Sequence, residues 1–296
     1  MIHVKKIMVP VDFSRPSKKA VNYGLSLASE FKARLVLTHI AAFDTAIYDK
    51  AKMQLLQLLP ADYRDQLDFE IIVKAGDIRQ ELLAIVDENE IDLVVMGSRG
   101  RSYFERMLLG SVTERLLRKL HVPILTVSHL DPEKELHEPG IVPLQRIVYA
   151  TDLTEGSQVG LEFSIRLGRG LNAHLTVVHV VQAFDVVGHG LETAFAPDYH
   201  AEARVHAAEK LSQVVSLVSD GSVPITTVLA DGVPYETINR IAAQKNADLI
   251  VINLQGKGLL DRALIGTTAE RVIRTASIPV LSLPLPAAYA ARWTAA

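Results

Sequence analysis

The segment KIMVPVDFS at residues 6–14 decides the fold, because the chain contains it twice. It recurs as RIVYATDLT at residues 146–154, and ARLVLTHI at residues 33–40 recurs as AHLTVVHV at residues 173–180. Both pairs have an offset of 140 residues. A repeat of this length indicates a duplicated domain rather than a solenoid.

The later part of each repeat matches at a larger offset. IDLVVMGSRG at 91–100 recurs as ADLIVINLQG at 247–256, and GSVTERLLRKLHVPILTV at 110–127 recurs as GTTAERVIRTASIPVLSL at 266–283. The offset is now 156, so the second repeat carries a net insertion of 16 residues between Val180 and Asp231. We expect this insertion to form a lid or a contact surface.

Within each repeat, short apolar runs alternate with segments of helical periodicity. In the first repeat the runs are IMVPV, LVLTHI, FEIIVKA, LVVMG and PILTVS, and the periodic segments are 17–29, 46–59, 78–88 and 111–120. Near-continuous β-branched runs between helices are typical of a parallel sheet covered on both faces. With right-handed crossovers, each repeat is predicted to be a doubly wound α/β domain.

Length and composition limit the classes of function. The 296 residues include 49% apolar and 22% charged residues, no cysteine and a net charge of -3. Disulfides and thiolate sites are therefore excluded, and nucleic acid is not expected as a partner. No signal pattern or membrane-spanning run is present, so a cytoplasmic protein is expected. We expect domains at 1–130 and 145–285, a charged, proline-containing linker at 131–144 and a tail at 286–296.

The candidate site lies where ligands bind in open α/β sheets, beyond the carboxyl ends of the strands at the point where strand order reverses. One segment there is Val11-Asp12-Phe13-Ser14, in which Ser14 is expected to cap the helix that follows. The other runs from Met96-Gly97-Ser98-Arg99-Gly100, across nine residues, to Gly110-Ser111-Val112-Thr113. Gly97 and Gly100 are expected to turn with positive φ, and the first amides of a helix opened by Gly110-Ser111 suit phosphate oxygens.

Each of these features also has an ordinary structural interpretation. Glycines often follow strands, and Ser111 could merely cap a helix; only the combined pattern G-x2-G-x9-G-S with Asp12 favours phosphate binding. Arg99, Arg101 and Arg106 could neutralise phosphates or form a solvated loop. Asp12 could accept hydrogen bonds from a ligand, cap the following helix, or both. No catalytic residue and no metal-ligand set is predicted, and His39 and His179 are expected to be packed and hydrogen-bonded.

These motifs resemble the ATP-binding branch of the universal stress protein family, in a tandem form covering nearly the whole chain. The matching features are V-P-V-D-F-S at residues 9–14, G-x2-G-x9-G-S-V at 97–112 and the closing V-P-I-L-T-V strand. The resemblance implies two five-stranded Rossmann-like domains of order 3-2-1-4-5 that form a pseudo-dimer. It implies an adenosine pocket around Val11, Asp12 and Ile40, and ribose and phosphate contacts from Met96, Gly97, Gly100, Gly110, Ser111 and Val112.

The second repeat departs from this pattern at one position. Asn253 replaces the first glycine, and the matching positions are otherwise Thr151, Asp152, Val180, Gly256, Gly266, Thr267 and Thr268. An asparagine tolerates left-handed backbone, but its side chain would occupy space that a glycine leaves open. We therefore expect a weaker or empty second site.

The resemblance also implies partners and a function. The last strand of each domain should pair with the other within the chain, and further pairing of whole chains stays open. The bound nucleotide would be ATP, ADP or AMP, and Mg²⁺ could accompany the phosphates. The expected function is a nucleotide-binding stress-response or signalling regulator that acts on an unidentified protein partner. The alternatives are a slow ATP-hydrolysing or adenylating enzyme, and an adaptor that binds another small ligand.

Overall fold

The computed structural model describes residues 3–41, 48–98, 109–128, 141–182, 196–255 and 265–284. Residues 131–140 of the predicted linker lie outside these residues, as do the C-terminal tail, the loop with Gly100 and its arginines, Gly256 and much of the inserted segment. The last four residues predicted as linker are described, and two of them, Val142 and Leu144, are buried in the core. Within the described ranges, no helix combines the length and apolarity needed to cross a bilayer.

The first repeat contains five strands and five helices. The strands are β1 (Lys6–Pro10), β2 (Arg34–Ala41), β3 (Phe69–Ala75), β4 (Leu93–Gly97) and β5 (Ile124–Val127). The helices are α1 (Arg15–Phe31), α2 (Tyr48–Gln57), α3 (Ala61–Arg64), α4 (Ile78–Glu88) and α5 (Ser111–Lys119). All the predicted strands and periodic segments are present; the short α3 was not predicted.

The second repeat follows the same order without a counterpart of α3. Its strands are β6 (Arg146–Ala150), β7 (His174–Val181), β8 (Ile225–Asp231), β9 (Leu249–Asn253) and β10 (Val280–Leu283). Its helices are α6 (Glu155–Gly170), α7 (Ala196–Val218), α8 (Pro234–Gln244) and α9 (Thr267–Thr275). The residues after the insertion thus belong to α7, which at 23 residues is longer than its counterpart α2, with 10.

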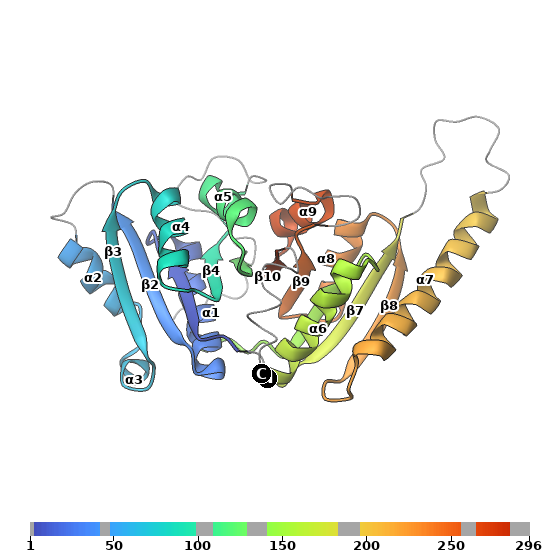
Figure 1. Cartoon of the computed structure of the whole chain (residues 1–296), viewed down its shortest axis with the longest axis horizontal. Coiled ribbons are helices and arrows are strands. Elements are labelled where there is room, and N and C mark those ends of the chain that lie inside the picture. The colour runs from blue at the N-terminus through green and yellow to red at the C-terminus, as the bar shows by residue number, and fades with distance from the viewer. Residues whose placement is uncertain are drawn as a thin grey trace.

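The strands form one ten-stranded sheet in the order β3-β2-β1-β4-β5-β10-β9-β6-β7-β8. Each half has the predicted 3-2-1-4-5 order, and its strands are parallel. The halves join through β5 and β10, which pair antiparallel with Leu125 opposite Leu281. Figure 1 shows β3 and β8 at the two outer sides and β10 near the middle. The prediction that the last strands pair within the chain is confirmed.

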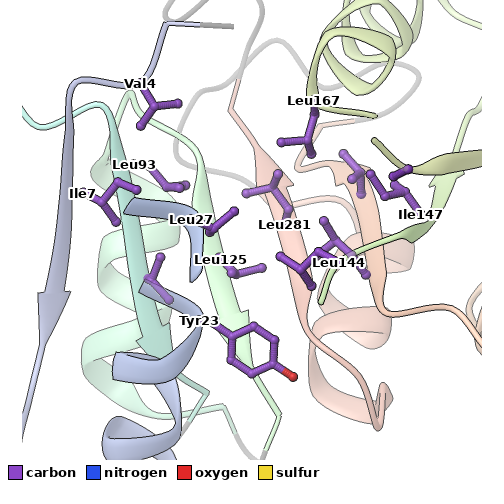
Figure 2. Close-up of a cluster of buried hydrophobic side chains, with 14 of the residues drawn as sticks. Val4, Ile7, Tyr23, Leu27, Leu93, Leu125, Leu144, Ile147, Leu167 and Leu281 are labelled. Atoms are coloured by element: carbon purple, nitrogen blue, oxygen red, sulfur yellow. The ribbon is translucent and has the colours of Figure 1, made fainter. Parts of the chain in front are cut away.

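Two apolar clusters, one on each face, run across both repeats. Residues of α1 and α6 share one cluster, and residues of α4, α5, α8 and α9 share the other. Figure 2 shows Leu125 and Leu281 facing each other between the halves, with Tyr23 and Leu27 of α1 beside them. Because one core spans the seam, the halves are expected to unfold together.

Polar contacts also tie the halves together. The Ser128 hydroxyl donates to the Ala276 carbonyl at 2.6 Å, and the Thr126 hydroxyl donates to the Val280 carbonyl at 3.1 Å. The amide of Val142 donates to the Ser26 hydroxyl of α1 at 2.6 Å. These groups are buried, so each hydrogen bond satisfies a polar atom that would otherwise be costly to desolvate.

Leu125→Ala tests this shared core, since Leu125 is 1% exposed. The substitution should lower the free energy of unfolding by about 2–5 kcal/mol. Urea unfolding followed by circular dichroism should stay a single transition at a lower midpoint. Leu217→Ala on α7, where the side chain is 69% exposed, is the control and should leave the midpoint unchanged. Two transitions, with only one moved by Leu125→Ala, would contradict a common core.

Candidate functional site: the crevice between β1 and β4

The crevice lies where strand order reverses, between β1 and β4. β1 pairs with β2 on one side and β4 on the other, so the chain winds in opposite directions from this point. The β1–β4 ladder holds only two residue pairs, Ile7 with Leu93 and Met8 with Val94. Beyond Met8 no further residue pair joins the two strands. In such sheets, ligands bind beyond the carboxyl ends of the strands at this point.

Pro10 explains why this ladder ends early. The amide of Val11 donates to the Thr38 carbonyl of β2 at 2.8 Å. Backbone groups of neighbouring strand residues point to opposite sides, so residue 10 faces β4. A proline there has no N–H to donate. A proline is unusual in a central strand, and here it lies where the two strands separate.

The second repeat lacks this break. Ala150 takes the place of Pro10, and the β6–β9 ladder continues through four pairs, from Ile147–Leu249 to Ala150–Ile252. The two strands therefore stay joined for two more residues than β1 and β4 do. The crevice of the first repeat begins deeper in the sheet than that of the second.

The turn after β1 holds Asp12 in a strained but well-bonded backbone. The Asp12 carboxylate accepts the Ser14 amide at 2.9 Å, and the Ser14 hydroxyl caps α1 by accepting the Ser17 amide. Between them, Phe13 has a φ of 64°, and Leu153 in the second repeat has a φ of 60°. Left-handed backbone at a bulky residue costs about 1–3 kcal/mol and tends to occur at functional sites. The capping predicted for Ser14 is confirmed.

His39 fixes the other side of this turn. Its Nδ1 lies 2.7 Å from the Val11 carbonyl, and its ring lies 4.8 Å from that of Phe13. His179 makes the same contact with the Thr151 carbonyl at 2.8 Å. The prediction of packed, hydrogen-bonded histidines is confirmed.

Val11 and Thr151, each directly before an aspartate, were expected beside the adenosine. Both are engaged in contacts within the protein and have few groups available to bind a ligand. The side chain of Val11 is buried in the core, and its backbone groups bond to β2. The Thr151 hydroxyl contacts Ser157 Oγ at 2.9 Å and accepts the Leu153 amide at 3.0 Å.

The amino end of α5 borders the crevice beside β4. Gly110 is the N-cap; its amide donates to the Ser98 carbonyl at 3.0 Å, and the Thr113 hydroxyl donates to the Gly97 carbonyl at 3.1 Å. These bonds anchor the helix start to the end of β4. In the described part of the chain, the amides of Ser111 and Val112 have no hydrogen-bond partner. Such amides at the positive end of a helix dipole can bind an anion.

The second repeat has the same arrangement at α9. Gly266 is the N-cap, and its amide donates to the Leu254 carbonyl at 2.7 Å. The amides of Thr267 and Thr268 likewise have no partner among the described residues. In this repeat Asp152 Oδ1 accepts both the amide and the hydroxyl of Thr154, whereas its buried Oδ2 has no partner. A buried carboxylate oxygen without a donor fits a site that receives one from a ligand.

The remaining predicted residues lie near the crevice but are mostly buried. Ile40, at the end of β2, and Met96, next to the end of β4, are 9% and 5% exposed and belong to the cluster beneath α4 and α5. Val180 is half-buried against the same cluster. Groups of three or more potential metal ligands are absent from the described residues.

The explanation predicted for Gly97 is wrong. Gly97 ends β4 and is not among the positive-φ glycines, which in the described residues are Gly76, Gly221 and Gly232. A Cβ at Gly97 would lie 2.8 Å from Pro16 Cβ, inside the first turn of α1. Glycine is required here because the helix approaches the strand closely, and not because the backbone turns toward a ligand.

The Asn253 side chain, which was expected to occupy space that a glycine leaves open, is directed toward α6. Its Nδ2 lies 3.3 Å from the Tyr149 hydroxyl and 3.3 Å from the Gly156 carbonyl, so the side chain lies beneath α6. Gly160 provides the room, since a Cβ there would lie 2.5 Å from Asn253 Oδ1 and from the Tyr149 hydroxyl. The first repeat has Val9, Ala20 and Gly97 at the three matching positions. The neighbours of the asparagine therefore make room for it and bond its Nδ2, whereas its buried Oδ1 has no hydrogen-bond partner among the described residues.

The effect of Gly160→Ala on the free energy of unfolding should reverse its sign when Tyr149 and Asn253 are replaced, and this reversal tests whether the three residues are coupled. In the natural chain, Gly160→Ala should lower the free energy of unfolding by about 1–3 kcal/mol because the added methyl group clashes. In a Tyr149→Val/Asn253→Gly background the same change should raise it by about 0.5–1 kcal/mol, since alanine is the better helix former. Urea unfolding of the four variants measures both values. An equal effect in the two backgrounds would show that the three residues are not coupled.

Sequence analysis missed Pro10 and the Tyr149–Gly160 pair, although the signal was present. The aligned repeats place Pro10 against Ala150, Val9 against Tyr149 and Ala20 against Gly160. These differences acquire meaning only when strand register and the helix face are known.

Comparisons with known proteins agree with the duplicated architecture. A model of the universal stress protein family matches the chain twice, over residues 3–128 and 143–284. A universal stress protein of Methanocaldococcus jannaschii is 34% identical over 137 residues, which are 45% of this chain and 79% of that protein. One from Mycobacterium tuberculosis is 29% identical over 202 residues, 65% of this chain, and the match spans only 62% of that longer protein.

Two solved structures share the whole two-repeat fold. A universal stress protein from Archaeoglobus fulgidus aligns over 96% of this chain and 97% of its own, with a TM-score of 0.66 and 21% identity. A functionally unknown protein from Pseudomonas aeruginosa aligns over 97% and 95%, with a TM-score of 0.68 and 19% identity.

Proposed function

The chain belongs to the universal stress protein family, and we propose that it is a nucleotide-binding regulator. An adenine nucleotide in the crevice between β1 and β4 would stabilise one conformation of the chain, and a partner protein would recognise that conformation. The nucleotide would be ATP, ADP or AMP. The observation that carries the proposal is the early end of the β1–β4 ladder next to the unpartnered amides of α5.

The residues around the first crevice fit the parts of such a ligand. The Ser111 and Val112 amides would bind phosphate oxygens, with the Ser111 hydroxyl as a further donor. Asp12 would accept hydrogen bonds from ribose or adenine while it holds the turn through Ser14. Gly100, in the intervening loop, would let the backbone approach the phosphates. Mg²⁺ would bind through the phosphates, because no protein ligand set for it is evident among the described residues.

The second repeat would hold a weaker site, for a reason other than the one the sequence suggested. The Asn253 side chain is bonded to Tyr149, and the longer β6–β9 ladder would narrow the opening. The unpartnered Asp152 Oδ2 and the free amides of Thr267 and Thr268 would still favour a ligand there. We propose that both repeats bind nucleotide and that the first binds more tightly.

Turnover beyond slow hydrolysis is not part of the proposal. A base, an acid and a charge-stabilising group would have to converge on the phosphates for efficient transfer. In the described residues the crevice offers one carboxylate and a helix terminus, which suffice for binding. The chain would then act through its conformation, as a reporter of nucleotide occupancy.

Asp12→Asn tests the first site and keeps the fold intact, because an asparagine Oδ1 can still accept the Ser14 amide. We expect at least a tenfold loss of affinity for ATP or AMP in calorimetric titration of the full chain. Asp152→Asn is the matched change and should affect only the weaker binding event. Mass spectrometry of ligand released from protein purified without added nucleotide should identify an adenine nucleotide. A different released ligand, or unchanged affinity in both variants, would refute the proposal.

Pro10→Ala tests what opens the crevice. The new amide can donate to β4, so the first ladder should lengthen to resemble that of the second repeat. Nucleotide affinity of the first site should fall several-fold. Hydrogen exchange should show that the introduced amide is protected. A protected amide together with full affinity would mean that ladder length does not control binding.

A further inference from the structure

A second candidate site lies at the opposite end of β1, roughly 16 Å from the crevice for a strand of this length. It is a cavity of about 450 Å³ where β1 and β2 begin and α1 ends. We call it the basic cavity; the residues that define it here are Lys5, Lys6, Phe31, Lys32, Arg34 and Asp68. The function proposed above does not use it.

The charge of the basic cavity is opposite in sign to that of the whole chain. Four cationic side chains and one carboxylate line it, whereas the net charge of the chain is -3. Arg34 is bonded to Asp68 at 2.8 Å, and Lys6 Nζ donates to the Asn89 carbonyl at 2.9 Å. In the described part of the chain, Lys5 and Lys32 have no ion pair. Both lysines are exposed, and two further carboxylates lie close by: Asp92 accepts the Lys5 and Lys6 amides, and Glu70 lies 3.7 Å from Arg34.

The walls of the cavity indicate the size and type of ligand. Val4 is 4% exposed and Phe31 packs against the core, so the cavity has a firm apolar side. Its volume lies in the range of small-molecule sites. The unpaired cations are lysines, which act as point charges on phosphate rather than as planar forks for a carboxylate. These properties favour a small ligand with several phosphate groups.

The second repeat provides an internal comparison. At the positions of Lys5 and Lys32 it has Gln145 and Asn172, both neutral. At the position of Lys6 it has Arg146, which forms an ion pair with the buried Asp248 at 2.9 Å. The same scaffold therefore folds without the unpaired cations.

Lys32 is also unusual for its backbone. It has a φ of 51°, and Asn172 at the matching position has a φ of 49°. Asparagine is well suited to this left-handed conformation and lysine is not. A cation at the end of α1 also offsets the helix dipole, but the dipole does not account for Lys5, which lies before β1.

We propose that the basic cavity binds a small, soluble anion with two or more phosphate groups. Binding would use the Lys5 and Lys32 ammonium groups, with Lys6 and Arg34 adding to the field. The site would work independently of the nucleotide crevice, so the chain could sense two ligands at once.

The test titrates inorganic tripolyphosphate into the full chain, with the crevice first saturated with AMP. A double variant, Lys5→Gln/Lys32→Asn, gives the first repeat the residues of the second. We expect this variant to bind tripolyphosphate at least tenfold more weakly and AMP with unchanged affinity. The control, Lys210→Gln/Lys245→Asn, makes the same charge change at an exposed residue of α7 and at the exposed residue that follows α8, and should bind like the natural chain.

Three outcomes would overturn the proposal. Equal losses in the test and control variants would mean that only net charge matters. Tripolyphosphate binding that AMP abolishes would place the anion in the crevice. Binding to phosphatidylglycerol vesicles without binding to tripolyphosphate would replace the soluble anion by a membrane surface.

One further result would support the proposal and distinguish it from the nucleotide site. An Asp12→Asn variant that loses AMP binding but still binds tripolyphosphate would show that the two sites are separate.

Discussion

The antiparallel pairing of β5 with β10 is the constraint on which the rest of the structure depends. Each repeat alone would leave a short, apolar last strand at the edge of its sheet, with unpaired backbone groups. Pairing Leu125 with Leu281 removes both edges and joins the two sheets into one. Because the strands meet antiparallel in a continuous sheet, α1 and α6 lie on the same face and share one core. The two covalently linked repeats are thus arranged like the two subunits of a dimer.

Because the domain is duplicated within one chain, the sequences of the two repeats can differ, and a substitution in one repeat can be compensated by neighbouring substitutions in that repeat. Both repeats share the bond from the aspartate to the amide two residues on, and the bond from the N-cap glycine of the last helix to the end of the fourth strand. Packing beneath the first helix differs, with a polar Tyr149–Asn253 contact in place of an apolar one. Backbone geometry near the crevice is therefore retained, while the layer behind it changes.

Much of the fold followed from sequence pattern alone. Apolar runs located the five strands of the first repeat, and the repeated segments located β6, β7, β9 and β10, whereas the 3-2-1-4-5 strand order was implied by the family resemblance. Local rules also predicted Ser14 as a helix cap. Side-chain direction could not be predicted at the site, because the face to which residue 97 or 253 points depends on strand register. The left-handed backbone conformation of Phe13 could not be predicted either, because it is imposed by the hydrogen bond between Asp12 and Ser14 and not by the preference of phenylalanine itself.

The glycine motif illustrates why a missing motif residue is weak grounds for assigning lost function. Residue 97 is a glycine because Pro16 packs against it. The residue type at this position therefore reflects helix packing, and it reflects ligand binding only indirectly. In the second repeat, Gly160 supplies the space that an asparagine needs, and the Gly156 carbonyl accepts a hydrogen bond from it. What distinguishes the two crevices is instead one backbone donor, absent at Pro10 and present at Ala150. A difference in affinity between the repeats should accordingly follow the length of the central ladder and not the completeness of the motif.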